Sequence, residues 1–375
     1  MNITQPLALL GALSPQQFMR RHWQKKPLLV RQAIPGFAGL LDRAELFALA
    51  GNDDVESRLV AHGPQGWRMR SGPFARRALP PLKQPDWTLL VQGVDLHVDA
   101  AHQLLQQFRF VPAARLDDLM ISYAADGGGV GPHFDSYDVF LLQARGRRRW
   151  RIGRQLDLGL QEGVPLKILA RFVPEQELVL DPGDMLYLPP RYAHDGVALG
   201  ECMTYSIGFR APSRAELARE LLQRLADEAG DAAGVALYRD SGQPAVDAPG
   251  RIPARLQNFA QRALQNALSD PSALSRALGE YLTEPKPHVW FDAAVVRRPI
   301  RSLALDRRTR MMFDDHHIFI NGESCRASGR DAALMRQLAD HRCLAADQVR
   351  RASEGALSLL ASWCEAGWLR EGVAP

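Results

Sequence analysis

Short apolar runs, separated by Gly, Pro and Asp, fill the chain from its beginning to about Arg210. A helix is expected first, because Ser14 followed by Pro15 is a typical helix start. Runs of this length and spacing are typical of β-strands, and many short strands in succession favour a β-barrel or a β-sandwich. The clearest strands are expected at 119–123, 139–143, 148–153, 177–180, 185–188 and 203–209.

From residue 213 the apolar positions follow a helical period instead. Ser213 and Glu216 form a capping box, and the leucines that follow recur on one helical face. A loop rich in Gly, Asp and Pro precedes a second helix, and a third helix follows Pro271. The apolar faces of these helices cannot all be buried internally, so this region is predicted to be a dimerisation element.

The last part of the chain mixes strands with short helices. Asn321-Gly322 after the apolar run at 317–320 is a typical hairpin turn. With helices expected further on, this combination is compatible with a winged-helix-like module. We therefore predict an α+β protein with three domains. They are a β-rich domain with an amino-terminal helix over 1–212, a helical dimerisation subdomain over 213–290 and a winged-helix-like domain over 291–375.

Composition narrows the class of protein. The 375 residues include 46 Lys and Arg against 42 Asp and Glu, which gives a net charge of +4. A hydrophobic content of 46% and a charged content of 23% exclude a disordered chain, a collagen and a coiled-coil rod. The charge is too small for a protein that coats nucleic acid, and no apolar run reaches the roughly 18–20 residues that span a bilayer. We expect a soluble, cytoplasmic protein.

Two potential metal ligands stand close together in the segment Gly131-Pro132-His133-Phe134-Asp135. Residues two apart in an extended strand point to the same face, so the side chains of His133 and Asp135 would converge. The best candidate for a third ligand is His194, which follows an Asp-Pro-Gly-Asp turn and a predicted strand. Two histidines and one carboxylate leave other metal positions open, which favours non-haem Fe(II) and oxygen chemistry. The alternative is a hydrogen-bonded His-x-Asp pair with a structural role only.

An arginine is expected inside the same barrel. The segment 146–152 should return from the strand at 139–143 through a tight turn, and strict alternation then places Arg148 on the inner face. A buried guanidinium requires an anionic partner, and a carboxylate held by two hydrogen bonds fits best. The partner is either an internal Asp or Glu or the carboxylate of a cosubstrate such as 2-oxoglutarate. We favour the cosubstrate, because the predicted metal occupies the same barrel.

Several motifs together resemble one protein family. HFD, ARGRRRW, DPGDMLYLPPRYAH and YSIGFR are similar to motifs of the Jumonji-C oxygenases. WQKKPLLVRQA and MISYAADGGGVGPHFDSYDVFLLQ further resemble the bacterial ribosomal oxygenases, which hydroxylate an arginine in large-subunit ribosomal protein number sixteen. The resemblance covers essentially the whole chain. It implies a double-stranded β-helix (the cupin or Jumonji-C barrel), a helical dimerisation part, a winged-helix-like carboxyl-terminal part and a homodimer.

The resemblance also implies a cofactor, two cosubstrates and the residues that bind them. Carried over residue by residue, it places Fe(II) on His133, Asp135 and His194, and the distal carboxylate of 2-oxoglutarate on Arg148. The second cosubstrate is O2. The strand at 203–209 should close the same pocket, and of its two inward hydroxyls we expect that of Ser206 to bind the cosubstrate carboxylate. The alternative for Ser206 is ordinary strand packing.

A cationic arginine substrate needs an acceptor or an aromatic wall near the metal. Asp118 opens a predicted strand that leads to Met120 and Ser122 on the same face, and Tyr137 lies two residues past Asp135. Asp118 and Tyr137 could hold a guanidinium by a charge-assisted hydrogen bond and by stacking. The alternatives are a strand-start cap for Asp118 and a rim position for Tyr137.

The predicted function is an Fe(II)- and 2-oxoglutarate-dependent arginine hydroxylase that acts on a large-subunit ribosomal protein and yields 3-hydroxyarginine, succinate and carbon dioxide. Three other hypotheses stay open. Related ribosomal oxygenases hydroxylate histidine, a cupin-like barrel can be a non-catalytic metal-binding regulatory module, and a winged helix can bind DNA. The modest net charge of +4 argues against the last, and the predicted function does not require contact with nucleic acid.

Overall fold

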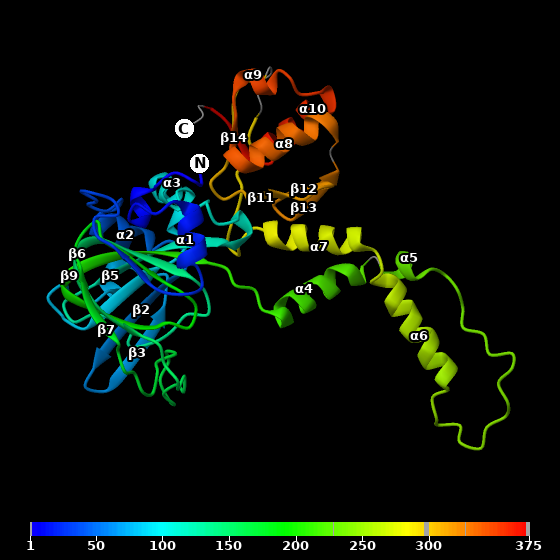
Figure 1. The fold of residues 1–375 in the computed structure, drawn as a ribbon, viewed down its shortest axis with the longest axis horizontal. Helices are drawn as coiled ribbons and strands as arrows, with labels where there is room; N and C mark the ends of the chain where they lie inside the picture. The colour runs from blue at the N-terminus through cyan, green and yellow to red at the C-terminus, as the bar shows by residue number, and fades with distance from the viewer. Residues whose placement is uncertain (1, 228, 296–299, 327, 373–375) are drawn as a thin grey trace. The chain divides into compact units, whose positions relative to one another are not determined.

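A computed structural model describes residues 2–372, except residues 228, 296–299 and 327. The chain forms two compact units, Met1–Ala211 and Pro212–Pro375. Figure 1 shows the first as a curved sheet flanked by short helices and the second as longer helices with small sheets. Within the described part of the chain, no helix is both long enough and apolar enough to cross a membrane. The domain boundary predicted at 290/291 stays a prediction.

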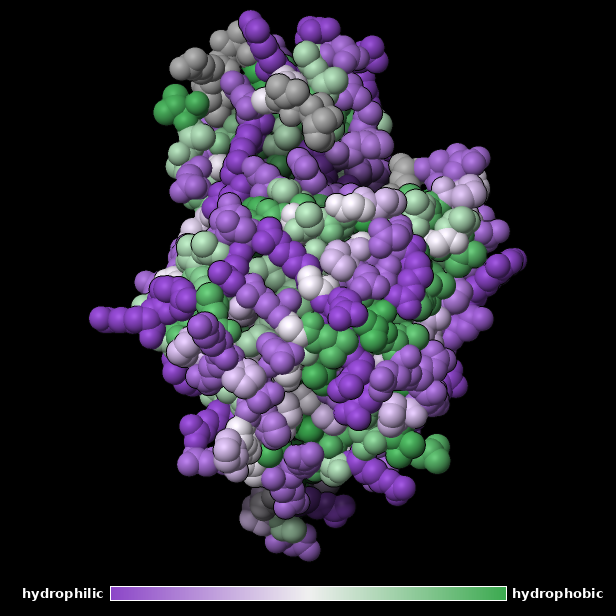
Figure 2. Space-filling view, turned by 90° about the vertical axis from the view of Figure 1, so that its left-hand side faces the viewer, coloured by the Kyte–Doolittle hydropathy of each residue, from purple (hydrophilic) through white to green (hydrophobic). Residues whose placement is uncertain are grey.

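The first unit is built on one nine-stranded sheet whose pairings are all antiparallel. The strand order is β1-β8-β6-β9-β5-β4-β2-β3, and β7 pairs with β6 beside this path. The outer face of this unit is mainly hydrophilic, with apolar side chains in separate patches (Figure 2). The strands are β1 Leu28–Val30, β2 Ser57–Gly63, β3 Gly66–Ser71, β4 Trp87–Val91, β5 Leu116–Ala124, β6 Val139–Gly153, β7 Gln176–Leu180, β8 Met185–Leu188 and β9 Ala193–Phe209.

Helices cover one face of this sheet. The first α-helix begins as predicted, because Ser14 and Gln17 form a reciprocal capping box ahead of its first turn. Its Phe18 is fully buried and packs against Phe140 and Tyr187 of the sheet. The helices are η1 Ala8–Leu10, α1 Pro15–Arg21, α2 Arg43–Leu49, η2 Arg76–Ala78, η3 Val94–Leu96, α3 Asp99–Gln106 and η4 Ala113–Arg115.

Strand β6, one of the two longest in the sheet, differs from its prediction. Two strands joined by a tight turn were expected, but residues 139–153 form a single strand. The register against β9 shifts on both sides of Arg145, which makes a β-bulge in place of the turn. Gly146 lies in the bulge with a φ of +58°, and a Cβ atom there would lie 2.1 Å from the carbonyl oxygen of Glu201. Gly146 thus lies in a bulge although it suggested a turn. Turns and bulges both use glycine where the backbone is left-handed and there is no room for a side chain.

The bulge changes which residues of β6 face the interior. Before it, Val139 and Leu141 belong to the inner core, whereas Phe140 belongs to the core under the helices. After it, Trp150 and Ile152 belong to the inner core. The inward positions therefore change from odd to even, since one extra residue in a strand reverses the side of all that follow.

The second unit contains two small sheets and seven helices among its described residues. Its core contains the fully buried Leu303, Leu338 and Leu360. The predicted hairpin is confirmed, because Asn321 and Gly322, with φ of +48° and +88°, join β12 to β13. The sheets are β14-β10-β15 and β11-β12-β13, with β10 Leu303–Leu305, β11 Met311–Phe313, β12 His317–Ile320, β13 Glu323–Arg326, β14 Cys343–Leu344 and β15 Leu369–Glu371. The helices are α4 Arg214–Ala226, α5 Ala229–Ala233, α6 Ala254–Ala267, α7 Pro271–Thr283, α8 Gly329–His341, α9 Ala346–Val349 and α10 Glu354–Glu365.

Candidate metal centre

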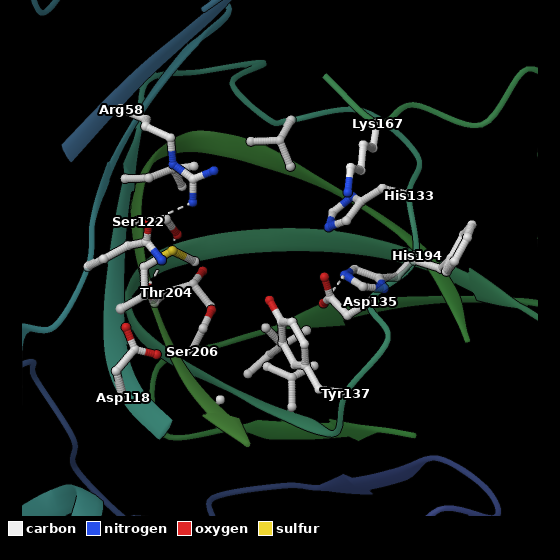
Figure 3. Close-up of a pocket in the computed structure, with 18 of the residues that line it drawn as sticks. Arg58, Asp118, Ser122, His133, Asp135, Tyr137, Lys167, His194, Thr204 and Ser206 are labelled. Carbon is white, nitrogen blue, oxygen red and sulfur yellow. Dashed lines mark hydrogen bonds and ion pairs between the residues drawn. The ribbon is translucent and has the colours of Figure 1, made fainter. Parts of the chain in front are cut away.

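Three ligand atoms meet in the interior of the first unit. One donor atom each from His133, Asp135 and His194 lies within 4.8 Å of the other two. The backbones of the two histidines form an isolated antiparallel bridge, with N–O distances of 3.0 and 2.8 Å. The Oδ2 atom of Asp135 lies 3.7 Å from Nε2 of His194. Figure 3 shows the three side chains together on one side of the pocket.

The ring orientations of both histidines suit metal binding. Nδ1 of His133 lies 2.9 Å from the carbonyl oxygen of Gly131, and Nδ1 of His194 lies 3.1 Å from that of Tyr192. Each Nδ1–H therefore donates to a carbonyl, which leaves the lone pair of Nε2 for a metal. Burial, followed by the neighbouring His133, lowers the pKa of His194 to about 4, so its imidazole is neutral at pH 7. This donor set fits Fe(II) with open coordination positions.

Local structure around the ligands corrects one expectation. His133, Asp135 and Tyr137 were expected to follow one strand direction, but of residues 131–138 only His133 pairs, through its bridge to His194 of β9. The carbonyl oxygen of Asp135 accepts a hydrogen bond of 2.7 Å from the backbone N–H of Arg191. The two ligand segments are thus joined by backbone hydrogen bonds at two points, which holds Asp135 near the histidines without a regular strand.

Arg148 lies in the same pocket and is deeply buried, with 3% of its surface exposed. Its guanidinium donates hydrogen bonds of 3.1 Å to the hydroxyl of Ser122 and to the carbonyl oxygen of Gly196, and it stacks 5.0 Å from the ring of Trp150. Among the described residues, no carboxylate lies within ion-pair distance of it. Burial lowers the pKa of Arg148 from its ordinary value, but a guanidinium stays charged at neutral pH.

A glycine on β9 makes room for this arrangement. Gly196 pairs with Trp150 across the strands, and a Cβ atom at Gly196 would lie 2.7 Å from Nε of Arg148 and 2.6 Å from the indole ring. No larger residue fits without moving the arginine. The structure thus excludes the alternative of an internal acidic partner within the described residues, and it leaves the guanidinium open to an anionic ligand.

The remaining predicted residues also line this pocket. Ser206 and Thr204 project from β9, and Asp118 projects from β5, on the side opposite the metal ligands (Figure 3). The Thr204 hydroxyl donates a 2.9 Å hydrogen bond to Oε1 of Gln143. The hydroxyl of Ser206 has no hydrogen bond to any described residue, which leaves it available to a ligand. Their roles in binding stay predictions.

An acidic end of the pocket surrounds Asp118 and Tyr137. A register shift in β5 between Leu116 and Leu119 lets both Asp117 and Asp118 line the pocket, although neighbours in a regular strand face opposite sides. Oδ2 of Asp118 accepts a 3.1 Å hydrogen bond from the backbone N–H of Gly93. Tyr137 lies in a bend rather than in a strand, and burial followed by the nearby carboxylates raises its pKa.

Two residues that line the pocket and one behind it were not predicted from the sequence. Arg58 of β2 and Lys167 of the loop between β6 and β7 line the pocket, and Gln143 contacts Thr204 behind it. The first two come from segments far from any motif, so no local signal marks them. Gln143 does carry a signal, because it is a polar residue that ends the apolar run Val139–Leu142.

Comparison with known proteins agrees with this fold and site. Residues 103–217 match the JmjC domain, and residues 264–370 match the ROXA-like winged helix. The first match covers β5, β6 and β9 with the three candidate ligands and Arg148. The first unit therefore contains a JmjC domain, and the candidate ligand trio lies within it. The predicted cupin-type barrel with a winged-helix-like carboxyl-terminal part is therefore confirmed.

Individual relatives narrow the family further. The chain is 36% identical over 273 residues to the ribosomal protein uL16 3-hydroxylase of Escherichia coli K12, which covers 72% of this chain and 71% of the relative. It is also 39% identical over 210 residues to a probable ribosomal oxygenase of Haemophilus influenzae. This match covers 55% of this chain and 52% of that protein. The solved structure of YcfD, a ribosomal oxygenase from Escherichia coli, in complex with cobalt and 2-oxoglutarate matches with a TM-score of 0.80 and 30% identity, over 96% of this chain and 99% of that one. The chain belongs to the JmjC-domain ribosomal oxygenases.

Proposed function

We propose that this protein is an Fe(II)- and 2-oxoglutarate-dependent oxygenase that hydroxylates an arginine of the large-subunit ribosomal protein uL16. One observation carries the proposal. A single pocket has a His-Asp-His trio at one side and the buried guanidinium of Arg148 at the other, and no acidic side chain among the described residues pairs with that guanidinium. A dicarboxylate that chelates a metal with one end and needs a cation at its other end fits both features. A non-catalytic metal-binding module has no need of the second feature.

Each pocket residue has a distinct part in this reaction. His133, Asp135 and His194 hold Fe(II), which with 2-oxoglutarate and O2 supplies the oxidising power to hydroxylate an unactivated carbon, with succinate and carbon dioxide as co-products. Arg148 holds the distal carboxylate of the cosubstrate, and the hydroxyl of Ser206 donates to it. The buried surroundings of Arg148 exclude water, which strengthens this ion pair.

The acidic end of the pocket favours arginine over histidine as the target. Asp117 and Asp118 line it, and the aromatic ring of Tyr137 stands near them. A guanidinium carries five donors and a permanent charge, whereas an imidazole is mostly neutral at pH 7. We propose that Asp118 accepts hydrogen bonds from the substrate guanidinium and that Tyr137 forms an aromatic wall beside it.

The test is mass spectrometry of a reaction with Fe(II), 2-oxoglutarate and recombinant uL16. The expected result is the gain of one oxygen atom on an arginine. The double variant His133→Ala with Asp135→Ala should abolish this gain. The matched control is Asp315→Ala with His316→Ala, an exposed pair of the same residue types in the second unit, which should retain it. Oxygen on a histidine would overturn the target, and neither hydroxylation nor succinate from the iron-loaded wild type would overturn the enzyme.

We further propose that the helical region forms a homodimer. None of the described residues of α6 is buried in one chain, although Leu256, Phe259 and Leu264 recur on one face with exposures of 38%, 36% and 60%. An apolar stripe of this kind is stable in water when a second copy covers it. Sedimentation of Leu264→Asp should show a monomer where the wild type is a dimer, and Gln265→Asp on the opposite face should leave the dimer intact. A ribosomal substrate would place the enzyme in the cytoplasm.

A further inference from the structure

One buried side chain holds the bulge of β6. Gln143 is fully buried, and its Nε2 donates hydrogen bonds of 2.8 Å to the carbonyl oxygen of Arg145 and 3.1 Å to that of Gly146. Both acceptors belong to the bulge itself. Carbonyl groups in a bulge lose their partners in the strand ladder, and an unpaired buried carbonyl is costly. The amide of Gln143 therefore replaces the ladder at the point where β6 is irregular.

The bulge determines the direction of Arg148. Val139 and Leu141 line the pocket before it, and Arg148 and Trp150 line the pocket after it. In a regular strand the odd-numbered inward series would continue, and Arg147 would take the inner face in place of Arg148. Whatever stabilises the bulge thus keeps the guanidinium of Arg148 in the pocket.

The same amide orients a hydroxyl of the pocket. The two carbonyl acceptors require N–H donors, which identifies the other end of the Gln143 amide as its oxygen. This oxygen accepts the hydrogen of the Thr204 hydroxyl at 2.9 Å. A hydroxyl has one hydrogen to donate, so Thr204 presents only lone pairs to the pocket, and Ser206 keeps a free donor.

We propose that Gln143 is a positioning residue for the cosubstrate: it holds the β6 bulge and thereby fixes the inward direction of Arg148 and the donor direction of Thr204. The inference rests on the proposed function, because it concerns the binding of 2-oxoglutarate by Arg148. Gln143 touches neither metal ligand nor substrate, and it acts through the two residues that it orients.

The experiment compares Gln143→Met with the wild type. Methionine has a similar length and fills the space but donates no hydrogen bond. Calorimetric titration of the Mn(II)-loaded protein with 2-oxoglutarate should show an affinity at least about tenfold weaker, the ratio expected when a hydrogen bond to a charged group is lost. The affinity for Mn(II) should stay unchanged. Gln32→Met is the matched control, since the exposed amide of Gln32 has the carbonyl of Pro182 as its one partner among the described residues.

Two readouts separate positioning from a general loss of stability. Hydrogen exchange of peptides that span residues 143–148 should accelerate in Gln143→Met without metal or cosubstrate, while exchange in β5 stays unchanged. In a double-mutant cycle, Gln143→Met should weaken 2-oxoglutarate binding in the wild type and add little in Arg148→Met, because both changes act on one interaction. If Gln143→Met does not fold, the same measurements are made on Gln143→Asn. This variant retains the amide, but its shorter side chain cannot reach both carbonyls.

The outcomes distinguish this inference from the proposed function. If wild-type protein with Mn(II) does not bind 2-oxoglutarate, the proposed function fails and the inference fails with it. If the wild type binds it and Gln143→Met binds equally well, only the inference is overturned. Effects of Gln143→Met and Arg148→Met that multiply independently would also overturn it, because they would show that Gln143 does not act through Arg148.

Discussion

Two deeply buried charges, one in each unit, have opposite surroundings. Asp306 in the second unit is 1% exposed, and its carboxylate is held by Nε of Arg308 at 2.8 Å and by the guanidinium of Arg370. Arg148 in the barrel is 3% exposed and has a hydroxyl and a carbonyl as its described partners. Both side chains bear the cost of burial, but of the two only Asp306 has described opposite charges at ion-pair distance to offset it.

The difference separates a structural charge from one that serves a ligand. Burial alone would raise the pKa of Asp306, but the hydrogen bonds and charges of Arg308 and Arg370 outweigh it and lower the pKa. At Arg148 burial outweighs the opposing effects of Cys202 and Asp195, so its pKa is lowered. A buried charge without an ion-pair partner lowers the stability of the fold. Such a cost is expected at a site where a bound anion neutralises the charge.

The largest expected effect follows from removing the uncompensated charge. Arg148→Met should weaken 2-oxoglutarate binding about 100-fold, because a buried ion pair with the cosubstrate is lost. Without cosubstrate, the free energy of unfolding should stay unchanged or rise by about 1 kcal/mol, since a buried charge without an acidic partner is removed. Calorimetry and urea unfolding measure the two effects, with Arg147→Met on the exposed face as control. A clear loss of stability would contradict the contrast with Asp306.

Removing the compensated charge should have the reverse result. Asp306→Asn should lower the free energy of unfolding of the second unit by about 2 kcal/mol, because two arginines lose their partner while still reaching solvent. Binding of 2-oxoglutarate by the barrel should not change. Hydrogen exchange of peptides from β10 and β15, measured in urea, reports the stability of the second unit. Asp315→Asn, at an exposed position, is the control. A weaker cosubstrate affinity would show that Asp306 is not purely structural.

The pKa of Asp306 also predicts a pH dependence. Because the folded pKa lies below the unfolded value of about 4, the carboxylate stabilises the second unit fully above that value. This stability should be lost as the pH falls through the lower folded pKa. The protection of the β10 and β15 amides, corrected for the intrinsic exchange rate at each pH, should therefore fall in acid, and it should fall less in Asp306→Asn. An equal response in the variant would assign the acid sensitivity to other groups.

The smallest expected effect concerns the hydroxyl of Ser206, which is the second donor in the pocket, after Arg148, that a ligand can reach. Ser206→Ala should weaken 2-oxoglutarate binding about tenfold, the effect of one hydrogen bond from a hydroxyl to a carboxylate, without lowering stability. The stability should not change because the hydroxyl has no partner among the described residues. Unchanged affinity in a calorimetric titration would leave Ser206 with the alternative role of strand packing.

Much of the candidate metal centre could be predicted because its signals are local. His133 and Asp135 are two residues apart, and His194 follows a recognisable turn and strand. The structure brings these three together within 4.8 Å, although the expected regular strand around Asp135 is absent. The ligand types and their spacing survive this error, since backbone bonds to Arg191 and His194 replace the strand.

The path of β6 could not be predicted in the same way. Gly146 with its left-handed backbone is equally consistent with a turn and with a bulge, and the choice depends on β9, some fifty residues away in sequence. Arg148 lies inside as predicted, and the alternation within 148–152 holds. The tight turn predicted before it is wrong, because β6 continues through a bulge that reverses the inward series.

The amino-acid sequence by itself determined the strand-rich first part, the hairpin at Asn321-Gly322 and the identity of the candidate ligands, because periodicity, turn chemistry and ligand spacing act over a few residues. Only the tertiary structure decided that no described carboxylate meets Arg148, that two neighbouring aspartates line one pocket and that Gln143 holds the bulge. These facts depend on which strands pair and in which register, and pairing between distant segments leaves no pattern in either segment alone.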